Sequence, residues 1–302
     1  MNSGIINVYK EAGYTSFDVV ARLRGILKIK KIGHTGTLDP DATGVLPVCI
    51  GKATRVCDML TDKDKIYEAT LRLGVVTDTY DISGKIINNS SVNCNEKELI
   101  DVIKSFEGDI LQVPPMYSAL KVDGKKLYEY ARAGVEIERK SRPVTIYSIE
   151  VIDVNLPEAK IRVHCSKGTY IRSLIFDIGE KLGCGATMTA LIRTKAGSFD
   201  LSDAKPLDEI ERIVRLGNID RIITKIDELF DSYPVFFVAG DEEVIKHAIN
   251  GCVITADSVF SESVSDFNNL DRVRMYLLDN RFIGIYQYIP DVGFKLEKMF
   301  LE

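Results

Sequence analysis

The most informative part of the chain is one glycine-rich stretch: residues 33–48 read GHTGTLDPDATGVLPV. Glycines at positions 33, 36 and 44 permit tight or left-handed turns and let a backbone approach a ligand closely. Asp39 stands between Leu38 and Pro40 within this loop. Such a loop would hold one carboxylate rigidly at the edge of a pocket, which makes Asp39 a candidate catalytic residue.

The same loop fits two other interpretations. In the first, Asp39 or Asp41 only caps a backbone amide inside a turn, as aspartates commonly do. In the second, the loop cradles a phosphate. However, it lacks the Gly-Lys-Ser/Thr ending of a P-loop, and its glycine spacing does not match the dinucleotide-binding fingerprint. Spacing alone therefore favours an ordinary turn, and other parts of the chain are needed to choose among these interpretations of the loop.

Regular hydrophobic patterns flank the loop on both sides. Upstream, Ser16 is expected to cap a helix whose apolar positions follow helical spacing: Phe17, Val20, Leu23 and Leu27. Downstream, strict alternation predicts half-buried strands over residues 66–73 and 159–165. Tyr67 lies on the apolar face of the first of these strands, although it carries a hydroxyl group.

Helices are predicted over residues 95–106 and from Gly168 onward, and Arg172 lies off the apolar stripe of the second. Residues 207–229 are expected to form a helical linker region without an obvious break. The composition changes near Ser232, where we place a domain boundary. Four strands are predicted beyond it: 235–238, 252–254, 272–277 and 282–286.

The overall composition is that of a soluble globular protein. The chain has 302 residues, 45% of them hydrophobic and 27% charged. It has no basic leader followed by an apolar run, and no apolar stretch reaches the roughly 18 residues of a membrane helix. We therefore expect a cytoplasmic protein without membrane contact. Six cysteines without Cys-x-x-Cys spacing and only three histidines predict reduced thiols and no metal site.

The charge distribution leaves room for a nucleic-acid partner despite a net charge of −5. Residues 233–302 carry 6 basic and 11 acidic side chains, whereas residues 1–232 carry 33 of each. Residues 1–55 hold 8 basic and 4 acidic groups, and residues 115–143 hold 7 and 4. RNA binding needs a local positive surface rather than a basic chain, and these two segments permit one.

Together with residues 51–55, GKATR, the glycine-rich loop resembles the central motif of the TruB-type tRNA pseudouridine-55 synthases over more than twenty positions. Further blocks resemble the family in the same order: KIY at 65–67, the segment 74–84, PPMYSALK at 114–121, CSKGTYIRSL at 165–174 and LIRTKAGSF at 191–199. The resemblance covers roughly residues 5–230. It departs at residues 10–13, KEAG, where the family usually has Lys-Pro-x-Gly.

The resemblance implies a fold and an activity. The fold is α+β: a catalytic domain, residues 1–232, with a mixed, largely antiparallel sheet, and a small β-rich, PUA-like RNA-binding domain, residues 233–302. Residues 115–143 would be an insertion that clamps the RNA. The implied reaction isomerises uridine 55 in the T-arm loop of tRNA to pseudouridine after base flipping, without a cofactor. The expected partner is tRNA, with no required protein partner, and the expected state is a monomer.

By the same resemblance, Asp39 is the nucleophile at ribose C1′, and Arg172 is the cation that keeps it ionised. Tyr67 would stack on the uracil and take part in proton removal. The residues expected to bind substrate are His34, Leu191 and Tyr170 around the flipped base, and Lys10 and Lys121, with Lys125, Lys126 and Arg142, on RNA phosphates.

Two rival functions remain at this stage. One is a guide-dependent pseudouridine synthase, whose catalytic subunit needs protein partners and typically has a more basic C-terminal region than this chain. The other is a non-catalytic RNA-binding or tRNA-folding protein that kept the scaffold. The presence of Asp39, Tyr67 and Arg172 argues against a loss of catalysis.

Overall fold

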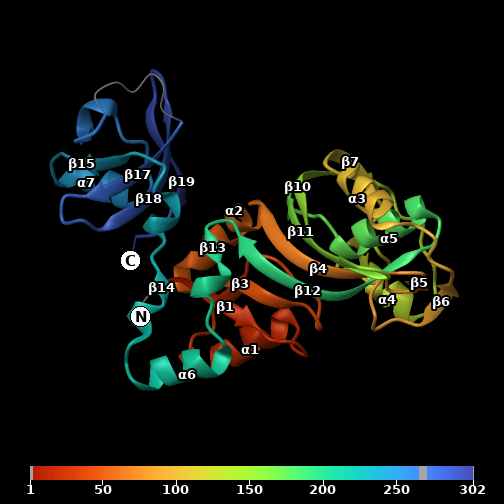
Figure 1. Ribbon diagram of the computed structural model, residues 1–302. Coiled ribbons are helices and arrows are strands. Elements are labelled where there is room, and N and C mark those ends of the chain that lie inside the picture. The colour runs from red at the N-terminus through yellow and green to blue at the C-terminus, as the bar shows by residue number, and fades with distance from the viewer. Residues whose placement is uncertain (1–2, 265–270, 302) are drawn as a thin grey trace.

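The structure, a computed structural model, describes residues 3–264 and 271–301, which form an α+β protein with two main sheets (Figure 1). The order of the large sheet is β14 (Ile223–Thr224), β1 (Gly4–Lys10), β3 (Thr43–Ile50), β12 (Ala186–Ala196), β4 (Lys65–Leu73), β11 (Glu158–Cys165), β10 (Arg142–Asn155) and β7 (Gly108–Gln112). Off this path, β2 (Ile32–His34) pairs with β3, and β13 (Phe199–Asp200) pairs with β12. The contact between β3 and β12 is parallel and the other pairings of this sheet are antiparallel. The expected mixed, largely antiparallel sheet is confirmed.

Helices cover the large sheet in two groups. α3 (Glu96–Lys104) and α5 (Ile171–Leu182) pack on β4, β10 and β11, where Leu99 and Leu174 are fully buried. α1 (Ser16–Leu27) and α6 (Leu207–Arg215) pack on β1 and β3 around Leu23 and Ile210. The alternation predicted for residues 66–73 and 159–165 is confirmed as β4 and β11.

The start of α1 differs from the prediction in a way that matters for the site. Thr15, rather than Ser16, is the N-cap, and its side chain accepts a hydrogen bond from the backbone N of Asp18. The buried face is centred on Val19 and Val20, so Phe17 is 65% exposed instead of lying in the core. Ser16 is buried and thus available for a contact outside the helix.

The expected unbroken helical region over 207–229 is wrong. α6 ends at Arg215, and Gly217 follows with a left-handed φ of 72°, a conformation that glycine adopts without strain. The chain then forms two short 3-10 turns, η3 (Ile219–Arg221) and η4 (Asp227–Phe230), on either side of β14. Helical spacing alone did not reveal this break.

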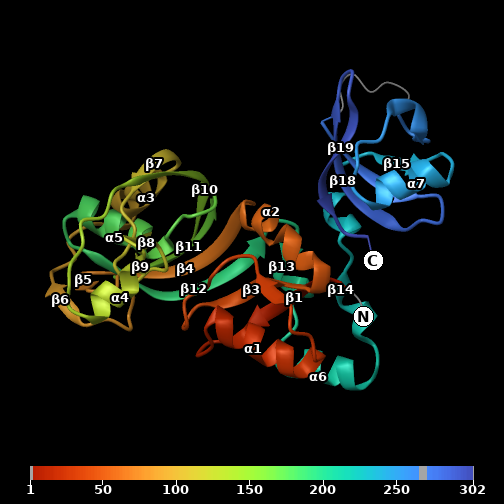
Figure 2. The same cartoon turned by 180° about the vertical axis from the view of Figure 1, so that it is seen from behind.

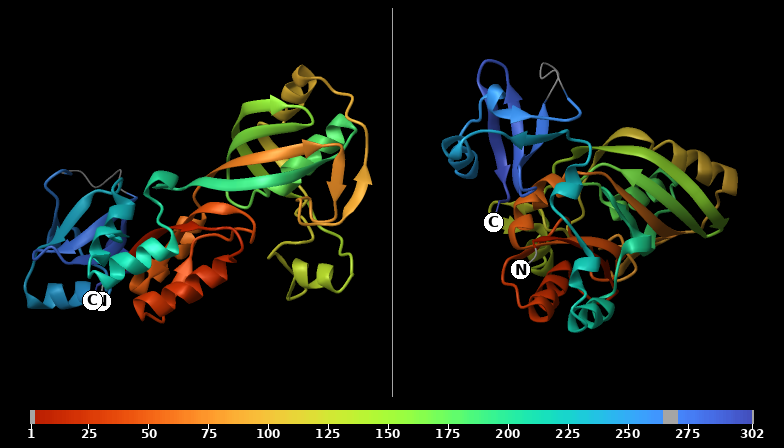
Figure 3. Two further views of the ribbon diagram at one scale, coloured as in Figure 1. Left: turned by 60° about the horizontal axis from the view of Figure 1, so that its bottom comes forward. Right: turned by 90° about the vertical axis from the view of Figure 1, so that its left-hand side faces the viewer.

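Residues 74–135 carry the elements that border the site. After η1 (Gly51–Val56), α2 (Cys57–Thr61) and β4, the hairpin β5 (Val75–Thr77) with β6 (Ile86–Asn89) leads to α3. A second hairpin, β8 (Lys121–Val122) with β9 (Lys125–Lys126), is followed by α4 (Leu127–Arg132). In Figure 3 (left) the segment with α4 projects from the sheet on the same side as α1.

The small sheet begins at Val235 and is seen from both sides in Figures 1 and 2. Its order is β16 (Val259–Phe260), β15 (Val235–Val238), β17 (Arg272–Leu277), β18 (Phe282–Ile289) and β19 (Gly293–Met299), with α7 (Glu242–Ile249) and η5 (Ala256–Ser258) beside it. The strand expected over 252–254 is wrong, because Ile254 makes only an isolated bridge with Phe294. Ile285 and Phe300 belong to one hydrophobic cluster that also contains Ile5 and Val45 of the large sheet. In the part of the chain that the structure describes, no helix has the length and apolar character to cross a membrane.

Candidate active site

The loop that carries Asp39 is fastened on both sides of that residue. Leu38, the residue before Asp39, is held by Ser16, whose hydroxyl accepts a hydrogen bond from the backbone N of Leu38 at 2.9 Å. Pro40, the residue after Asp39, is held by Lys10, whose Nζ donates to the Pro40 carbonyl oxygen at 2.8 Å. Because α1 and β1 belong to the packed core, these contacts fix the backbone around the carboxylate.

Lys10 has a different place from the one expected for a phosphate ligand. Its side chain is fully buried, and Nζ donates to three carbonyl oxygens, those of Glu11, Tyr14 and Pro40. Burial lowers the pKa of Lys10 to about 8. The expected contact with an RNA phosphate does not fit this placement. The lysine instead shares the Pro40 carbonyl with Gly13, whose N–H also donates to it and whose φ of 84° is one that glycine adopts without strain.

Arg172, in the first turn of α5, binds the Asp39 carboxylate with two separate nitrogens. Nε lies 3.0 Å from Oδ2, and a terminal nitrogen donates to Oδ1 at 3.0 Å. The remaining guanidinium contacts go to the Tyr117 carbonyl at 2.8 Å, the Thr79 carbonyl at 3.1 Å and the Asp81 carboxylate at 3.3 Å. Hydrogen bonds to Asp39, Tyr117 and Thr79 are thus joined by charge contacts to both carboxylates, and Arg172 is only 4% exposed.

Arg172 is not a surface residue of its helix, although it lies off the apolar stripe. The segment after β5 covers this face of α5, with the ring of Tyr80 stacked on Phe176 at 4.1 Å between centroids. Such coverage turns an apparently solvated arginine into a buried one. A buried guanidinium requires negative partners, and Asp39 and Asp81 provide them.

The ionisation of Asp39 is set by opposing effects. Burial in the cleft raises the pKa of Asp39 above its ordinary value, and the Asp81 carboxylate acts in the same direction. Arg172 and Lys10 oppose the rise. Arg172 thus limits the increase in pKa but does not reverse it, in contrast to the simple expectation of a lowered value. The side chain keeps 39% of its surface open, so the carboxylate is accessible to a substrate.

Two cavities meet at Asp39, and Arg172 and Leu191 line both of them. The smaller, of about 530 Å³, contains Tyr67 and Tyr170, as well as Arg142 at its rim. The larger, of about 910 Å³, is bordered by His34 and Phe17 and by Tyr128 and Arg132 of α4. The structure therefore brings together the expected residues Asp39, Arg172, Tyr67, Tyr170, Leu191 and His34.

Tyr67 lies opposite Arg193 in the ladder between β4 and β12, so their side chains share one face of the sheet. Burial raises the pKa of Tyr67, while the Arg193 guanidinium beside it has the opposite effect. A neutral phenol is thus favoured in the free protein. This argues for the aromatic ring, rather than a phenolate, as the feature presented to the cavity.

Arg193 is a site residue to which sequence reasoning gave no role. It is buried, and its guanidinium donates to the carbonyl oxygens of Val45 at 2.7 Å and Gly36 at 3.3 Å, at the two ends of the Asp39 loop. Gly44 permits this approach, because a Cβ there would lie 2.2 Å from the Arg193 carbonyl oxygen. Its location within the LIRT block was the only available signal.

His34 and Tyr170 reach the cavities from the ends of their elements. His34 ends β2, and its Nδ1 accepts a hydrogen bond from the Gly36 N–H at 3.3 Å. Burial lowers the pKa of His34, which favours a neutral ring. Tyr170 precedes α5, and Gln112 holds its backbone through both N–H and C=O. Burial raises the pKa of its phenol. These placements suit contact by shape and stacking.

The segment with α4 brings some of the expected cations to the site and not others. Lys126 and Arg132 border the larger cavity, on either side of Tyr128, whose ring lies 5.4 Å and 5.3 Å from their charged groups. Lys121 is exposed on β8 and does not line either cavity. Tyr128 and Arg132 were missed, because nothing in the local sequence separates them from other surface residues.

Comparison with known proteins gives the family. The model "TruB family pseudouridylate synthase (N terminal domain)" matches residues 24–171, and "tRNA pseudouridylate synthase B C-terminal domain" matches residues 172–231. Proteins called tRNA pseudouridine synthase B are 47% identical in Clostridium kluyveri, over 99% of both chains, and 50% identical in Lachnoclostridium phytofermentans, over 95% of both. The chain belongs to the TruB family of pseudouridylate synthases.

Solved structures support the same family and fold. A chain from an H/ACA RNP bound to a substrate RNA containing 2′-deoxyuridine is 26% identical, with a TM-score of 0.72 over 99% of this chain and 85% of that one. A chain from a Cbf5–Nop10–Gar1 complex is 28% identical, with a TM-score of 0.71 over 98% and 84%. The TruB-type resemblance is confirmed, and so is the expected α+β fold with a mixed sheet and a β-rich C-terminal part.

Proposed function

We propose that this TruB-family protein isomerises uridine 55 in the T-arm loop of tRNA to pseudouridine, with Asp39 as the nucleophile. The observation that carries the proposal is the Asp39 carboxylate held by two 3.0 Å contacts to buried Arg172, at the junction of two cavities. The names of relatives at 47% and 50% identity support tRNA as the substrate class.

The reaction begins with base flipping, because the C1′–N1 bond is out of reach while the uridine is stacked in its loop. Asp39 attacks C1′ and uracil departs with the electron pair of the C1′–N1 bond. The uracil then rotates and C5 bonds to C1′, which releases the carboxylate. C5 loses its proton and N1 gains one, so that substrate and product are isomers and no cofactor is required.

The surrounding side chains would position the base and limit its movement during this rotation. Tyr67 provides a ring for stacking, and the raised pKa of its phenol favours that role over action as a phenolate base. Leu191, which lines both cavities, would pack on the rotating uracil. Tyr170 and His34 would complete the enclosure from opposite sides of Asp39.

The proposal includes roles for the remaining segments. Residues 115–143 act as a clamp on the RNA, through Lys126 and Arg132 near the cavity and Lys121 further out. Residues 1–232 form the catalytic domain, and residues 233–302 form a PUA-like RNA-binding domain. The small sheet that starts at Val235 supports this division. The protein works as a cytoplasmic monomer without a protein partner.

A guide-dependent synthase is the second candidate, because the two solved relatives come from an H/ACA RNP and a Cbf5–Nop10–Gar1 complex. The two functions are separated by the purified protein alone with a T-arm hairpin labelled with tritium at uridine C5. A stand-alone synthase releases one tritium per hairpin, and a hairpin with cytidine at the target position stays silent. Absence of release without added proteins or guide RNA would exclude the stand-alone function.

A further inference from the structure

Cys49 and Cys57 lie close together, although neither has a part in the proposed reaction and neither lines the cavities at Asp39. Cys49 is the next-to-last residue of β3, and Cys57 is the first residue of α2. Both are free thiols in the structure. Neighbouring thiols can be joined and separated by the transfer of two electrons, so the geometry of this pair decides whether it forms a reversible modification site.

Gly33 makes room for the two sulfur atoms to meet. In the ladder between β2 and β3, Gly33 lies opposite Cys49, so a side chain at position 33 would stand beside that of Cys49 on the same face of the sheet. The Sγ of Cys57 occupies this space instead, because it lies 3.4 Å from where a Cβ at Gly33 would be. Directly opposite positions have Cβ atoms about 4.5–5.5 Å apart, which brings the Cys57 sulfur next to the Cys49 side chain.

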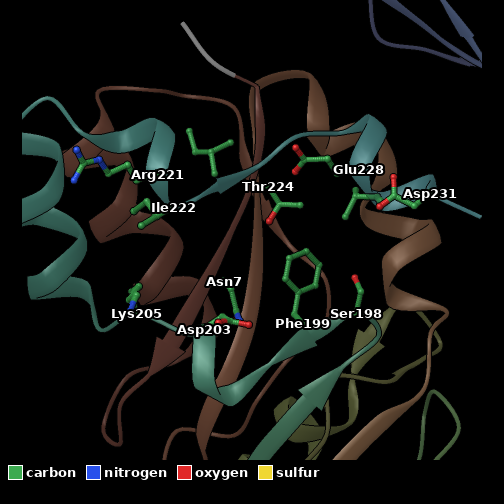
Figure 4. Close-up of a pocket in the computed structure, with 12 residues that line it drawn as sticks. Asn7, Ser198, Phe199, Asp203, Lys205, Arg221, Ile222, Thr224, Glu228 and Asp231 are labelled. Atoms are coloured by element: carbon green, nitrogen blue, oxygen red, sulfur yellow. The ribbon is translucent and has the colours of Figure 1, made fainter.

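The two thiols share one hydrophobic cluster but differ in their access to solvent. Cys49 is fully buried in a cluster with Ile5 and Val45, whereas Cys57 packs against this cluster and is partly exposed. The cluster extends to Phe199, which also lines a separate cavity of about 550 Å³ (Figure 4). A small oxidant from solvent therefore meets Cys57 before Cys49.

The two thiols also differ in acidity. Cys49 donates a hydrogen bond to the Cys57 sulfur, and this bond, together with the Lys298 ammonium, lowers the pKa of Cys57 against the opposing effects of burial and Asp58. The same hydrogen bond and burial raise the pKa of Cys49. Since the thiolate is the form that attacks an oxidant, Cys57 is suited to react first, while Cys49 keeps its proton for a second step.

A disulfide requires the sulfur atoms to approach to about 2.05 Å, and the surroundings decide which of them moves. Cys49 is held on both sides, because it pairs with Ile5 of β1 and with Gly33 of β2. The helix α2 has only five residues and none of them is buried. The approach is thus a shift of the start of α2 over Gly33, and it requires no change in the loop that carries Asp39.

We propose that Cys49 and Cys57 form a reversible thiol–disulfide pair that reduces small hydroperoxides. The Cys57 thiolate attacks the hydroxyl oxygen of the peroxide, the O–O bond breaks, and Cys57 becomes a sulfenic acid while the departing oxygen takes a proton from water. Cys49 Sγ then attacks the Cys57 sulfur. The S–O bond breaks, and hydroxide leaves with its electron pair and takes the Cys49 proton to form water. Two electrons pass from the thiols to the peroxide, and an external dithiol returns them.

The pair would keep oxidation of this region reversible. A sulfenic acid that has no neighbouring thiol is oxidised further to a sulfinic acid, which dithiols do not reduce. Cys49 intercepts Cys57 before that stage. The two cysteines therefore have different predicted fates when either of them is removed.

The test is peptide mass mapping of the full-length protein after a small excess of hydrogen peroxide and immediate alkylation of the free thiols. Trypsin cleaves between the two cysteines, at Lys52 and Arg55, so they fall in separate peptides, residues 32–52 and 56–63. In the unaltered protein these peptides should be joined with the loss of two hydrogen atoms, and dithiothreitol should separate them. Cys252, which is exposed, is the internal reference for the dose of oxidant.

Two variants separate the roles of the thiols. In Cys49→Ala, Cys57 has no partner and should gain two oxygen atoms as a sulfinic acid that dithiothreitol does not reverse. Fragment masses distinguish this gain from oxidation of Met59 in the same peptide. In Cys57→Ala, Cys49 should stay unmodified at the same dose. The matched control, Cys252→Ala, should form the bridge as the unaltered protein does.

The proposal is overturned if the two peptides stay separate at a dose that fully oxidises Cys252. It is also overturned if Cys57 stays unoxidised in Cys49→Ala, or if Cys49 is oxidised in Cys57→Ala as readily as Cys57 is in the unaltered protein. Formation of the bridge is measured without any variant, so the first outcome decides the matter even if Cys49→Ala fails to fold.

Discussion

Removal of the cation that holds Asp39 gives the most informative perturbation of the site. In Arg172→Met, the carboxylate loses both 3.0 Å contacts and keeps Asp81 as a neighbour. An arginine beside a carboxylate lowers its pKa by roughly 1–3 units. Because Asp39 retains 39% exposure, water screens part of this interaction, so the pKa of Asp39 in the variant rises by less than it would in a dry site.

The direction in which the pH profile moves follows from the ionisation state in which Asp39 reacts. In the proposed reaction the anion is the nucleophile, so activity should fall as the pH drops through the pKa of Asp39. Burial already raises that pKa, and removal of Arg172 raises it further, so the acid limb of the profile moves to higher pH. Single-turnover tritium release, measured between about pH 5 and pH 9 with enzyme in excess, reports this limb directly.

Two controls make this result interpretable. Arg162→Met removes an arginine of β11 that pairs with Glu68 and Glu150, and it should leave the acid limb in place. Arg172→Lys keeps the charge but loses the two-point geometry, so its limb should move less than that of Arg172→Met. An acid limb that is the same in Arg172→Met and in the unaltered enzyme would refute the account of the ion pair.

Three further predictions concern neighbouring groups. Asp81→Asn removes a carboxylate that raises the pKa of the nucleophile, so its acid limb should move to lower pH, opposite to Arg172→Met, while the turnover rate falls because the arginine loses a partner. Lys10→Met removes a buried donor from three carbonyl groups, of which that of Pro40 keeps the bond from Gly13, and should lower the free energy of unfolding in urea by about 1–3 kcal/mol, with turnover reduced more than hairpin affinity. The double variant Lys126→Ala with Arg132→Ala should reduce the slope of log Kd against log salt by about 1–2, whereas Lys97→Ala on α3 should leave it unchanged.

The spacing of apolar residues predicted the strands and helices that have one buried and one exposed face. β4, β11 and α3 have one buried and one exposed face, so alternation or helical spacing is visible in the sequence. β1 was missed because it is buried on both faces, so its residues, GIINVYK, do not alternate between apolar and polar side chains. The break after Arg215 was missed because α6 and the turns that follow it share similar apolar spacing.

The site required information that the sequence pattern alone does not contain. The family resemblance drew attention to Asp39, Arg172 and Tyr67, and the fold brings them around one pair of cavities. Arg193 and Lys10 owe their places to carbonyl groups that are distant in the chain, such as Val45 and Pro40. No spacing rule distinguishes a buried lysine with three carbonyl partners from one that is free to meet a phosphate.

The central claim is that Asp39 carries the chemistry, and tritium release by Asp39→Asn tests it most directly. The matched control is Asp41→Asn, an exposed carboxylate in the same loop. Asp39→Asn should bind the T-arm hairpin within about threefold of the unaltered protein and release no tritium above background, because an amide is no longer an anionic nucleophile. Asp41→Asn should release it at a near-normal rate. Normal release by Asp39→Asn would contradict the account.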